Sequence, residues 1–177
     1  MSTQNHSDYY IAMTQLIETT HLTTNKGLLN LLHDIEPNSG FLNNEYNLSE
    51  SDLEQHLSSL ISHSNGINLP SGWVPYSTYW LFVNNKPVGV SRLRHTLNDY
   101  LRNFGGHIGY AIGKNERNKG YGYDILRLTI EKATEMNITN LLVTCSSSNI
   151  GSQKIITKNG GKLMESKDGI NFYQIKL

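Results

Sequence analysis

The sequence predicts one α+β domain whose mixed, mostly antiparallel sheet is flanked by helices. Three observations lead to this fold class. Apolar residues recur at helical spacing in the first third, aromatic and β-branched residues form short runs in the middle, and strands then alternate with helices before a closing hairpin. This order fits an α+β architecture. We expect the 177 residues to form a single domain, with a helical region over 1–66 and the sheet over 73–177.

The first third predicts helices. Residues 8–35 carry apolar side chains at helical spacing, with a break at residues 23–25 and a stop at residues 37–40. Ser51-Asp52-Leu53-Glu54 has the pattern of a capping box and opens a further helix, which Asn65-Gly66 closes.

The middle of the chain predicts an antiparallel meander. Residues 77–83 and 87–95 are rich in aromatic and β-branched residues, and Asn84-Asn85-Lys86 between them is typical of a hairpin turn. A third strand follows over residues 107–112. A short loop then leads to a helix over residues 120–136, whose apolar side chains share one face.

The last part predicts alternating elements and a closing hairpin. A short buried strand covers residues 141–145, and Asn149 caps a helix over residues 150–158. Strands over residues 162–165 and 171–177 are joined across Asp168-Gly169, a strong hairpin signal.

Composition excludes several classes of protein. No apolar run approaches the roughly 20 residues that a membrane span needs, and the first residues lack the pattern of a secretion signal. The one cysteine, Cys145, fits a reducing compartment. We therefore expect a cytoplasmic protein that has no membrane partner. The net charge of zero argues against nucleic-acid binding, and we expect no metal site.

The charges are unevenly distributed along the chain. Residues 1–85 hold eight acidic residues and one basic residue, whereas residues 86–177 hold fourteen basic and seven acidic residues. A basic second half suits a phosphate-bearing ligand, and an acidic first half suits a cationic one. Alternatively, the two halves neutralise each other across the fold.

The loop before the helix at residues 120–136 has the features of a phosphate-binding site. Gly120 and Gly122 stand where the helix begins, flanked by Arg117 and Lys119. The first turn of a helix has N–H groups without intrahelical partners, and its dipole favours negative charge. A P-loop is excluded because Gly-Lys-Ser/Thr is missing, and a Rossmann fingerprint is excluded because Ile125 replaces the third glycine.

The spacing Arg117-x-x-Gly120-x-Gly122 resembles the coenzyme A signature of the GNAT (GCN5-related) N-acetyltransferases. Downstream, residues 149–152 and 158–161 resemble the family's Asn-x-x-Ala/Ser and Glu-Lys-x-Gly segment. Upstream, the resemblance is to a bacterial branch of predicted acetyltransferases. The motifs that carry it are Trp73-Val74-Pro75, Tyr79-Trp80-Leu81, Val88-Gly89-Val90, Leu93-Arg94-His95, Leu97-Asn98 and Gly105-Gly106-His107-Ile108-Gly109-Tyr110.

The resemblance implies a GNAT-type sheet with splayed central strands and acetyl-CoA as the cofactor. It makes residues 1–66 the acceptor side and residues 73–177 the acetyl-CoA-binding core. Backbone amides would hold the pyrophosphate, and the amide near Ile112 would pair with the pantetheine arm and stabilise the oxyanion. Asn149 and Ser152 would contact the cofactor from the far side. The pyrophosphate residues implied in this way are Arg117, Asn118, Lys119, Gly120, Tyr121, Gly122 and Tyr123.

The sequence departs from the family at both of its usual proton-handling positions. Ile156 stands where many members have a tyrosine acid, and Gly106 stands where many have a glutamate base. His107 is the nearest candidate base, although a structural histidine is an alternative. Ser146 and Cys145 are candidates for ordering a chain of water molecules. For Cys145 the alternative is a buried small residue.

Arg94 and His95 are candidates for binding an acceptor's carboxylate, or else are salt-bridged sheet residues. The expected function is direct transfer of an acetyl group to a primary amine of a small molecule or peptide, in a ternary complex. The alternatives are a non-catalytic acyl-CoA-binding module and a protein-interaction domain that uses its N-terminal helices. The C-terminal hairpin offers an edge for a homodimer.

Overall fold

The computed structural model describes residues 13–20, 27–38 and 40–177. The strands are β1 (Thr14–Glu18), β2 (Tyr76–Val83), β3 (Lys86–Arg94), β4 (Ile108–Ile112), β5 (Asn140–Ser146), β6 (Lys162–Lys167) and β7 (Ile170–Lys176). The α-helices are α1 (Gly27–Asp34), α2 (Leu53–Ser64), α3 (Tyr121–Glu135) and α4 (Ile150–Lys158). Short helical turns are η1 (Glu50–Asp52), η2 (Leu101–Gly105) and η3 (Lys114–Glu116).

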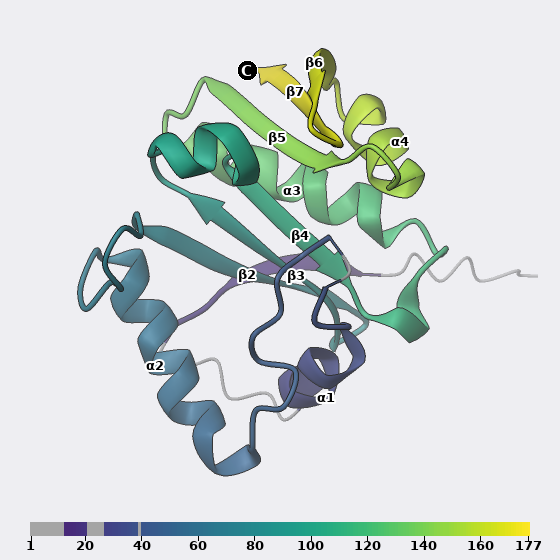
Figure 1. The fold of residues 1–177 in the computed structure, drawn as a ribbon. Coiled ribbons are helices and arrows are strands. Elements are labelled where there is room, and N and C mark those ends of the chain that lie inside the picture. Colours follow the sequence, from purple (N-terminus) through teal and green to yellow (C-terminus); the bar gives the residue numbers. More distant parts are fainter. Residues whose placement is uncertain (1–12, 21–26, 39) are drawn as a thin grey trace, which may run out of the picture.

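The strands form two antiparallel sheets that meet at one point. The first has the order β1-β2-β3-β4 and the second the order β5-β7-β6. The strands β4 and β5 run in the same direction, lie together near their first residues and diverge toward their ends (Figure 1). The predicted α+β class, with a mixed, mostly antiparallel sheet and splayed central strands, is confirmed.

Helices cover both faces of the first sheet (Figure 1). One face packs on α1 and α2, and its core includes Leu28, Leu57, Trp80 and Ala111. The other face packs on α3. Because successive strand residues point to opposite faces, neighbouring residues of β4 belong to different cores.

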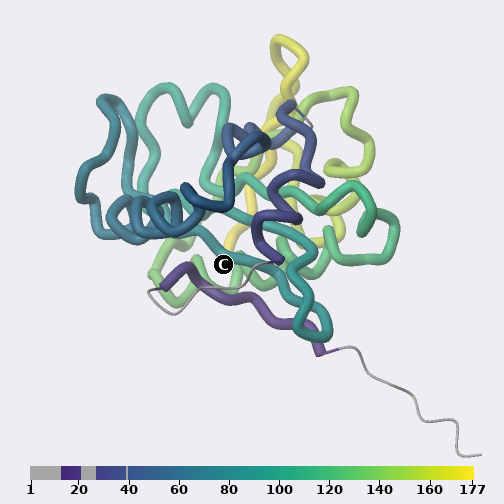
Figure 2. The backbone as a smooth tube through the Cα atoms, turned by 90° about the horizontal axis from the view of Figure 1, so that it is seen from below, coloured from purple at the N-terminus to yellow at the C-terminus, as the bar shows by residue number. Residues whose placement is uncertain are grey.

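Both predicted hairpin turns are present. Asn84 and Asn85 have φ values of 50° and 63°, and Asp168 and Gly169 have φ values of 50° and 77°. Two successive residues in the left-handed region make the tight turn whose twist matches antiparallel strands. The turn between β6 and β7, in yellow, projects beyond the other elements (Figure 2).

The predicted helix over residues 8–35 is wrong at its centre, because residues 14–18 form β1. This strand pairs with the edge of β2, from Thr14 opposite Val83 to Glu18 opposite Tyr79. Pairing across about 60 residues satisfies the free edge of β2, which local spacing does not reveal. The helical prediction is confirmed over α1, whereas residues 8–12 and the break at residues 23–25 lie outside the described residues.

The predicted capping box begins two residues too late in the chain. Ser49 caps η1, since its Oγ accepts a hydrogen bond from the N–H of Asp52 and donates one to the Asp52 carboxylate. The helix α2 then begins at Leu53. The other predicted helices and strands agree with the structure to within about two residues at their ends.

None of the helices in the described part of the chain has both the length and the apolar character that crossing a membrane requires.

Candidate active site

A cavity of about 460 Å³ lies where the end of β4 meets the starts of α3 and α4. This volume is in the range of sites for small molecules and cofactors. Three segments line the cavity: residues 110–112 of β4, residues between 116 and 123, and residues between 149 and 158. The cavity therefore occupies the wide end of the gap between β4 and β5.

The loop between β4 and α3 has a backbone conformation that depends on its residue types. Gly120 precedes α3 with a φ of 89°, and Asn118 has a φ of 63°. Glycine and asparagine adopt this left-handed region at the lowest cost. At Gly122, a Cβ atom would lie 2.7 Å from Cδ1 of Ile155 in α4. The glycine thus lets α3 and α4 approach each other, so that the N-termini of both helices border the cavity.

The edge of β4 that faces the gap has no strand partner, although its Ile112 carbonyl accepts a hydrogen bond from the Arg117 Nε. The N–H of Arg94 bonds to the carbonyl of His107, and the N–H of Gly113 bonds to the carbonyl of Val88. Alternate residues of an antiparallel strand face the same neighbour, so residues 107, 109, 111 and 113 face β3. The backbone groups of Tyr110 and Ile112 consequently face β5, which has diverged and pairs with β7 instead.

The start of α4 forms the opposite wall of the cavity. The Asn149 Oδ1 accepts a hydrogen bond of 3.0 Å from the Ser152 N–H and so caps the helix. Two lysines that the sequence analysis missed, Lys154 and Lys158, line the same wall. Their spacing of four residues places both lysines on one face of a helix. This spacing could have identified them from the sequence.

Neither lysine has a carboxylate partner within ion-pair distance among the described residues. The Nζ of Lys158 lies 4.6 Å from the centre of the Tyr123 ring. Lys158 is the last residue of α4, but its contact with Tyr123 brings its charge to the first turn of α3. Unneutralised cations near this first turn make the cavity suitable for a phosphate-bearing ligand.

Two basic residues of the loop, Arg117 and Lys119, are already paired with carboxylates. The Arg117 Nε donates to the carbonyl of Ile112 at 3.2 Å, and its guanidinium pairs with Glu36. Lys119 pairs with Glu116, whose pKa is lowered by this contact and by a second contact with Lys86.

Ion pairs also join the two halves of the chain. Glu36 pairs with Arg117, and Glu45 pairs with Arg92. These contacts favour the view that the acidic first half and the basic second half neutralise each other. They weaken the argument from charge for a cationic acceptor.

Most of the residues predicted to bind the cofactor converge on the cavity. Those that line it are Ile112, Arg117, Asn118, Gly120, Gly122, Tyr123, Asn149 and Ser152. Lys119 and Tyr121 lie in the same segment but do not line it. Tyr110, which the sequence analysis did not place among the cofactor residues, lines the cavity as well.

Gly106 and Ile156, which replace the family's proton-handling residues, are both tightly packed in the interior. Gly106 has φ 63° and ψ −169°, and a Cβ atom there would lie 2.5 Å from the carbonyl oxygen of Leu142. No side chain fits at this position without moving β5. Ile156 is fully buried in the core between α3, α4 and the second sheet.

His107 connects the two sheets at the narrow end of the gap. Its N–H donates to the carbonyl of Leu142 at 2.7 Å, and its Nδ1 accepts from the N–H of Leu142 at 2.9 Å. The neutral ring must then carry its proton on Nε2. Burial lowers the pKa of His107, and nearby cations add to this effect. With its basic nitrogen occupied, the geometry favours a structural role over that of a base.

Ser146 ends β5 at the wide end of the gap. Its exposed hydroxyl lies 2.8 Å from the Ser148 hydroxyl and accepts a hydrogen bond from the Ser148 N–H. Cys145 packs against the core that contains Ile156, and burial raises the pKa of its thiol. The geometry therefore favours a packing role for Cys145.

The structure separates Arg94 from His95, because Arg94 is the last residue of β3 and His95 follows the strand beside Ser77. The Nη1 of Arg94 donates to the carbonyls of Gly105 and Gly106 at 3.2 and 3.1 Å. Burial lowers the pKa of Arg94 to about 10. The His95 Nε2 lies 3.1 Å from the Ser77 hydroxyl, away from the gap.

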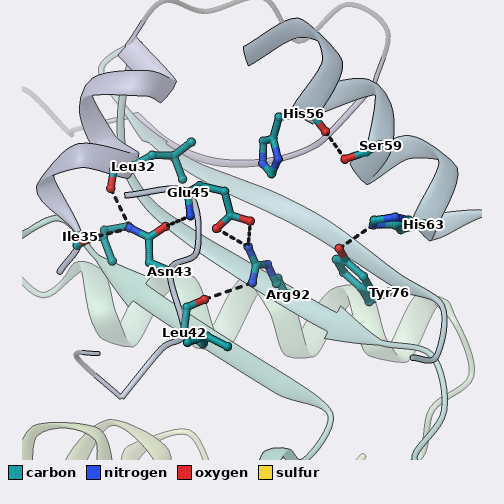
Figure 3. Close-up of polar contacts among 10 residues, drawn as sticks. All are labelled: Leu32, Ile35, Leu42, Asn43, Glu45, His56, Ser59, His63, Tyr76 and Arg92. Carbon is teal, nitrogen blue, oxygen red and sulfur yellow. Dashed lines mark hydrogen bonds and ion pairs between the residues drawn. The ribbon is translucent and has the colours of Figure 1, made fainter. Parts of the chain in front are cut away.

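A polar cluster holds the segment between α1 and α2 over the face of the first sheet that these two helices cover (Figure 3). Arg92 makes two hydrogen bonds of 2.9 Å to the Glu45 carboxylate, and both side chains are largely buried. The amide of Asn43 donates to the carbonyls of Leu32 and Ile35 at the end of α1. These contacts place the segment beside β3 and β4, and its Gly40 lies close to Asn149 in the cavity wall.

The comparisons with known proteins agree with this geometry. The sequence profile of the acetyltransferase (GNAT) domain matches residues 32–162. A search of curated protein sequences found no significant match. Among solved structures, the chain resembles the N-acetyltransferase PseH of Campylobacter jejuni in complex with acetyl coenzyme A, with 16% identity and a TM-score of 0.60. That alignment covers 93% of this chain and 99% of PseH.

Two further structures have the same fold. The ribosomal alpha-N-protein acetyltransferase RimL in complex with coenzyme A has 17% identity and a TM-score of 0.63, over 93% of this chain and 94% of RimL. The ribosomal-protein-S5-alanine acetyltransferase of Vibrio fischeri has 14% identity and a TM-score of 0.65, over 93% of this chain and 92% of that chain. Because the profile spans well over half of the sequence, the protein belongs to the GNAT family of acetyltransferases, which use acetyl-CoA.

Proposed function

We propose that this protein transfers the acetyl group of acetyl-CoA directly to a primary amine of a small molecule or peptide, in a ternary complex. The observation that carries the proposal is the edge of β4 that has no strand partner, beside a cavity bordered by two helix N-termini. An extended pantetheine arm can add to such an edge as a strand would. The diphosphate then lies at the first turn of α3, near Lys154 and Lys158.

The arrangement supports catalysis by positioning. Holding an amine against the thioester supplies much of the acceleration. The amides of Tyr110 and Ile112 face the gap, and the one beside the thioester carbonyl stabilises the oxyanion. The amine loses its proton to water, because Gly106 and Ile156 offer no base, and the exposed Ser146 hydroxyl is our candidate for ordering that water.

We propose that the acceptor approaches from the face covered by α1, α2 and the segment between them. Arg94 lies on this face at the narrow end of the gap, with no carboxylate partner among the described residues. It is our candidate for binding an acidic group of the acceptor. We propose no acceptor contact for His95, which lies with Ser77.

Isothermal titration with acetyl-CoA tests the cofactor site. Gly120→Glu puts a carboxylate beside the proposed diphosphate, and we expect it to abolish measurable binding. Gly160→Glu is the matched control, because both glycines have positive φ (89° and 84°) and no atom within 4 Å of a Cβ, but only Gly120 lines the cavity. Equal affinity in both variants would refute the proposed site.

A panel of amines with detection of released thiol tests catalysis. We expect sustained turnover with at least one primary amine. Binding of acetyl-CoA without turnover on small amines, peptides or protein N-termini would favour the alternative, a non-catalytic acyl-CoA-binding module. This alternative is supported by Gly106 and Ile156, which are packed in the interior and supply no proton-handling side chain.

The proposed assembly is a homodimer through the C-terminal hairpin. Every residue of β6 is exposed, including Leu163 and Met164 at 54% and 63%. An exposed apolar edge strand favours pairing with a second copy. Light scattering of the purified protein distinguishes a dimer from a monomer, and charged residues at both positions would abolish a dimer that uses this edge.

A further inference from the structure

One guanidinium on the proposed acceptor side has no counter-charge. No carboxylate of the described chain lies within ion-pair distance of Arg94. Its neighbour Arg92, by contrast, is neutralised by Glu45 (Figure 3). Because a partly buried charge without a partner is costly, an anionic ligand would stabilise the Arg94 side chain.

Arg94 is held in place and still has donors for a ligand. Its Nη1 donates to the carbonyls of Gly105 and Gly106, and these contacts fix the plane of the guanidinium. Nε and Nη2 donate no hydrogen bond to the described residues, and both are accessible to solvent. These two N–H groups form one side of the planar fork, which matches the two oxygens of a carboxylate.

Gly109 leaves a space beside this guanidinium. A Cβ atom at Gly109 would lie 3.8 Å from Nη1 and Nη2 of Arg94 and 3.6 Å from Cδ2 of Phe41, which are ordinary contact distances. Because glycine has no Cβ, the space between the Phe41 ring and the guanidinium stays open, and Gly109 is partly exposed within β4. This space, the Gly109 slot, can take a small group of a ligand.

The Gly109 slot lies next to the proposed reaction centre. Tyr110 follows Gly109 in β4, and its N–H faces the gap, where it can stabilise the oxyanion. The nitrogen of the acceptor must approach the thioester carbonyl close to this N–H. A group bound in the slot is therefore displaced from the nitrogen by about one residue along the strand, or roughly 3.3 Å. A carboxylate on the carbon that bears the amine spans this separation.

We propose that the acceptor is a free amino acid, whose carboxylate binds Nε and Nη2 of Arg94 while its amine faces the thioester. This inference rests on the proposed function, since it requires acetyl-CoA in the gap. The uncompensated charge of Arg94 matches the single negative charge of a carboxylate, whereas a phosphate monoester carries about two. A peptide N-terminus fits less well, because its first carboxyl group is an uncharged amide.

The transfer balances without a further reactant. The ammonium group of the amino acid loses a proton to water, and the nitrogen attacks the carbonyl carbon of the thioester. A C–N bond forms, the C–S bond breaks with its electron pair left on sulfur, and the nitrogen releases a second proton to water. The thiolate takes up a proton from water, and the carboxylate is unchanged throughout.

A comparison of free amino acids with their α-carboxamides tests the inference. Release of the coenzyme A thiol from acetyl-CoA measures acetylation of both. The carboxamide keeps the amine and the side chain but lacks the negative charge, and it also represents a peptide N-terminus. We expect at least one amino acid to have a kcat/KM about tenfold to a hundredfold above that of its carboxamide, as for a hydrogen bond to a charged group. Both values are calculated for the uncharged amine, because the two amines differ in pKa.

Arg94→Gln removes the charge, and we expect the preference for the amino acid over its carboxamide to disappear. The affinity for acetyl-CoA, measured by titration, should stay at the wild-type value. Arg102→Gln is the matched control, because Arg102 is an exposed cation in the neighbouring turn η2. This control should keep the wild-type preference.

Gly109→Ala tests the slot without a change of charge and keeps the contacts that hold Arg94. The added Cβ fits at ordinary contact distances, so the variant should fold and bind acetyl-CoA like the wild type. The methyl group displaces the carboxylate from the slot, and we expect kcat/KM for the amino acid to fall by about a hundredfold. An unchanged kcat/KM would refute the slot as the carboxylate site.

The outcomes separate the two proposals. If the wild type acetylates no amine of any kind, the proposed function fails and the amino-acid assignment falls with it. If carboxamides or amines without a carboxylate are acetylated as well as the amino acids, only the amino-acid assignment is refuted. A preference that survives in Arg94→Gln, or that disappears in Arg102→Gln, would also refute it.

Discussion

At the scale of single residues, Gly106 and His107 join the start of β4 to β5. Gly106 has backbone angles that only glycine adopts readily, and it touches the Leu142 carbonyl. His107 then pairs with the same residue through its backbone and its ring. The gap that opens beyond this contact depends on both residues.

Gly106→Ala should destabilise the protein by about 3 kcal/mol or more, because a strained backbone and a clash with β5 add together. Gly169→Ala is the control, since Gly169 also has positive φ (77°) but no atom lies within 4 Å of its Cβ position. The control should cost only about 1–2 kcal/mol. Urea unfolding measures both, and equal losses would contradict the tight contact at Gly106.

His107 should make stability depend on pH. The pKa of His107 is lowered in the folded protein, so below about pH 6.5 the unfolded chain binds more protons than the folded one. The free energy of unfolding therefore decreases as the pH is lowered. Above that pH the contribution is complete. In His107→Asn, the side-chain oxygen can still accept from Leu142 but does not titrate.

The measurement is urea unfolding of both proteins between pH 7 and pH 5. The wild type should lose more stability than the variant over this interval. His56 and His95 also have lowered pKa values, but they are present in both proteins and cancel in the comparison. Parallel curves would show that the Nδ1 contact contributes nothing to the pH dependence.

At the scale of elements, α1 is tied to the loop that precedes α3. The Asp34 carboxylate accepts hydrogen bonds from the Asn115 N–H at 3.0 Å and from its side-chain amide at 2.6 Å. Glu36 pairs with Arg117 just beyond. The helix over the proposed acceptor side is thereby connected to the proposed diphosphate site.

Glu36→Gln should strengthen acetyl-CoA binding, because it releases Arg117 from a competing carboxylate. The pair is about 40% exposed, so it contributes about 0.2–1 kcal/mol and the gain in affinity is roughly 1.4-fold to fivefold. Glu131→Gln is the control, since Glu131 pairs with Arg127 on α3, outside the cavity. Titration at low salt measures both, and a gain in the control or none in Glu36→Gln would contradict the competition.

At the scale of the whole molecule, local sequence signals located most of the fold. The Asn84-Asn85 and Asp168-Gly169 turns demand left-handed residues and were identified from residue type alone. The loop residues around Gly120 were found for the same reason, since their conformation is a local property. Gly106 was recognised in the sequence as a departure from the family pattern, but its packing against Leu142 was not.

What sequence reasoning missed depends on contacts between distant parts of the chain. β1 is a strand because the edge of β2 pairs with it, and nothing within residues 14–18 requires this. Tyr110 was not predicted to line the cavity, and only the position of α4 reveals that it does. Likewise, only the folded structure shows that Lys154 and Lys158 line the cavity.

The central claim is that acetyl-CoA occupies the gap between β4 and β5. A crystal structure of the protein with acetyl-CoA tests it most directly. We predict pantetheine amides bonded to the backbone of Tyr110 and Ile112 and the diphosphate at the first turn of α3. A coenzyme bound elsewhere, with the edge of β4 still without a strand-like partner, would contradict the account.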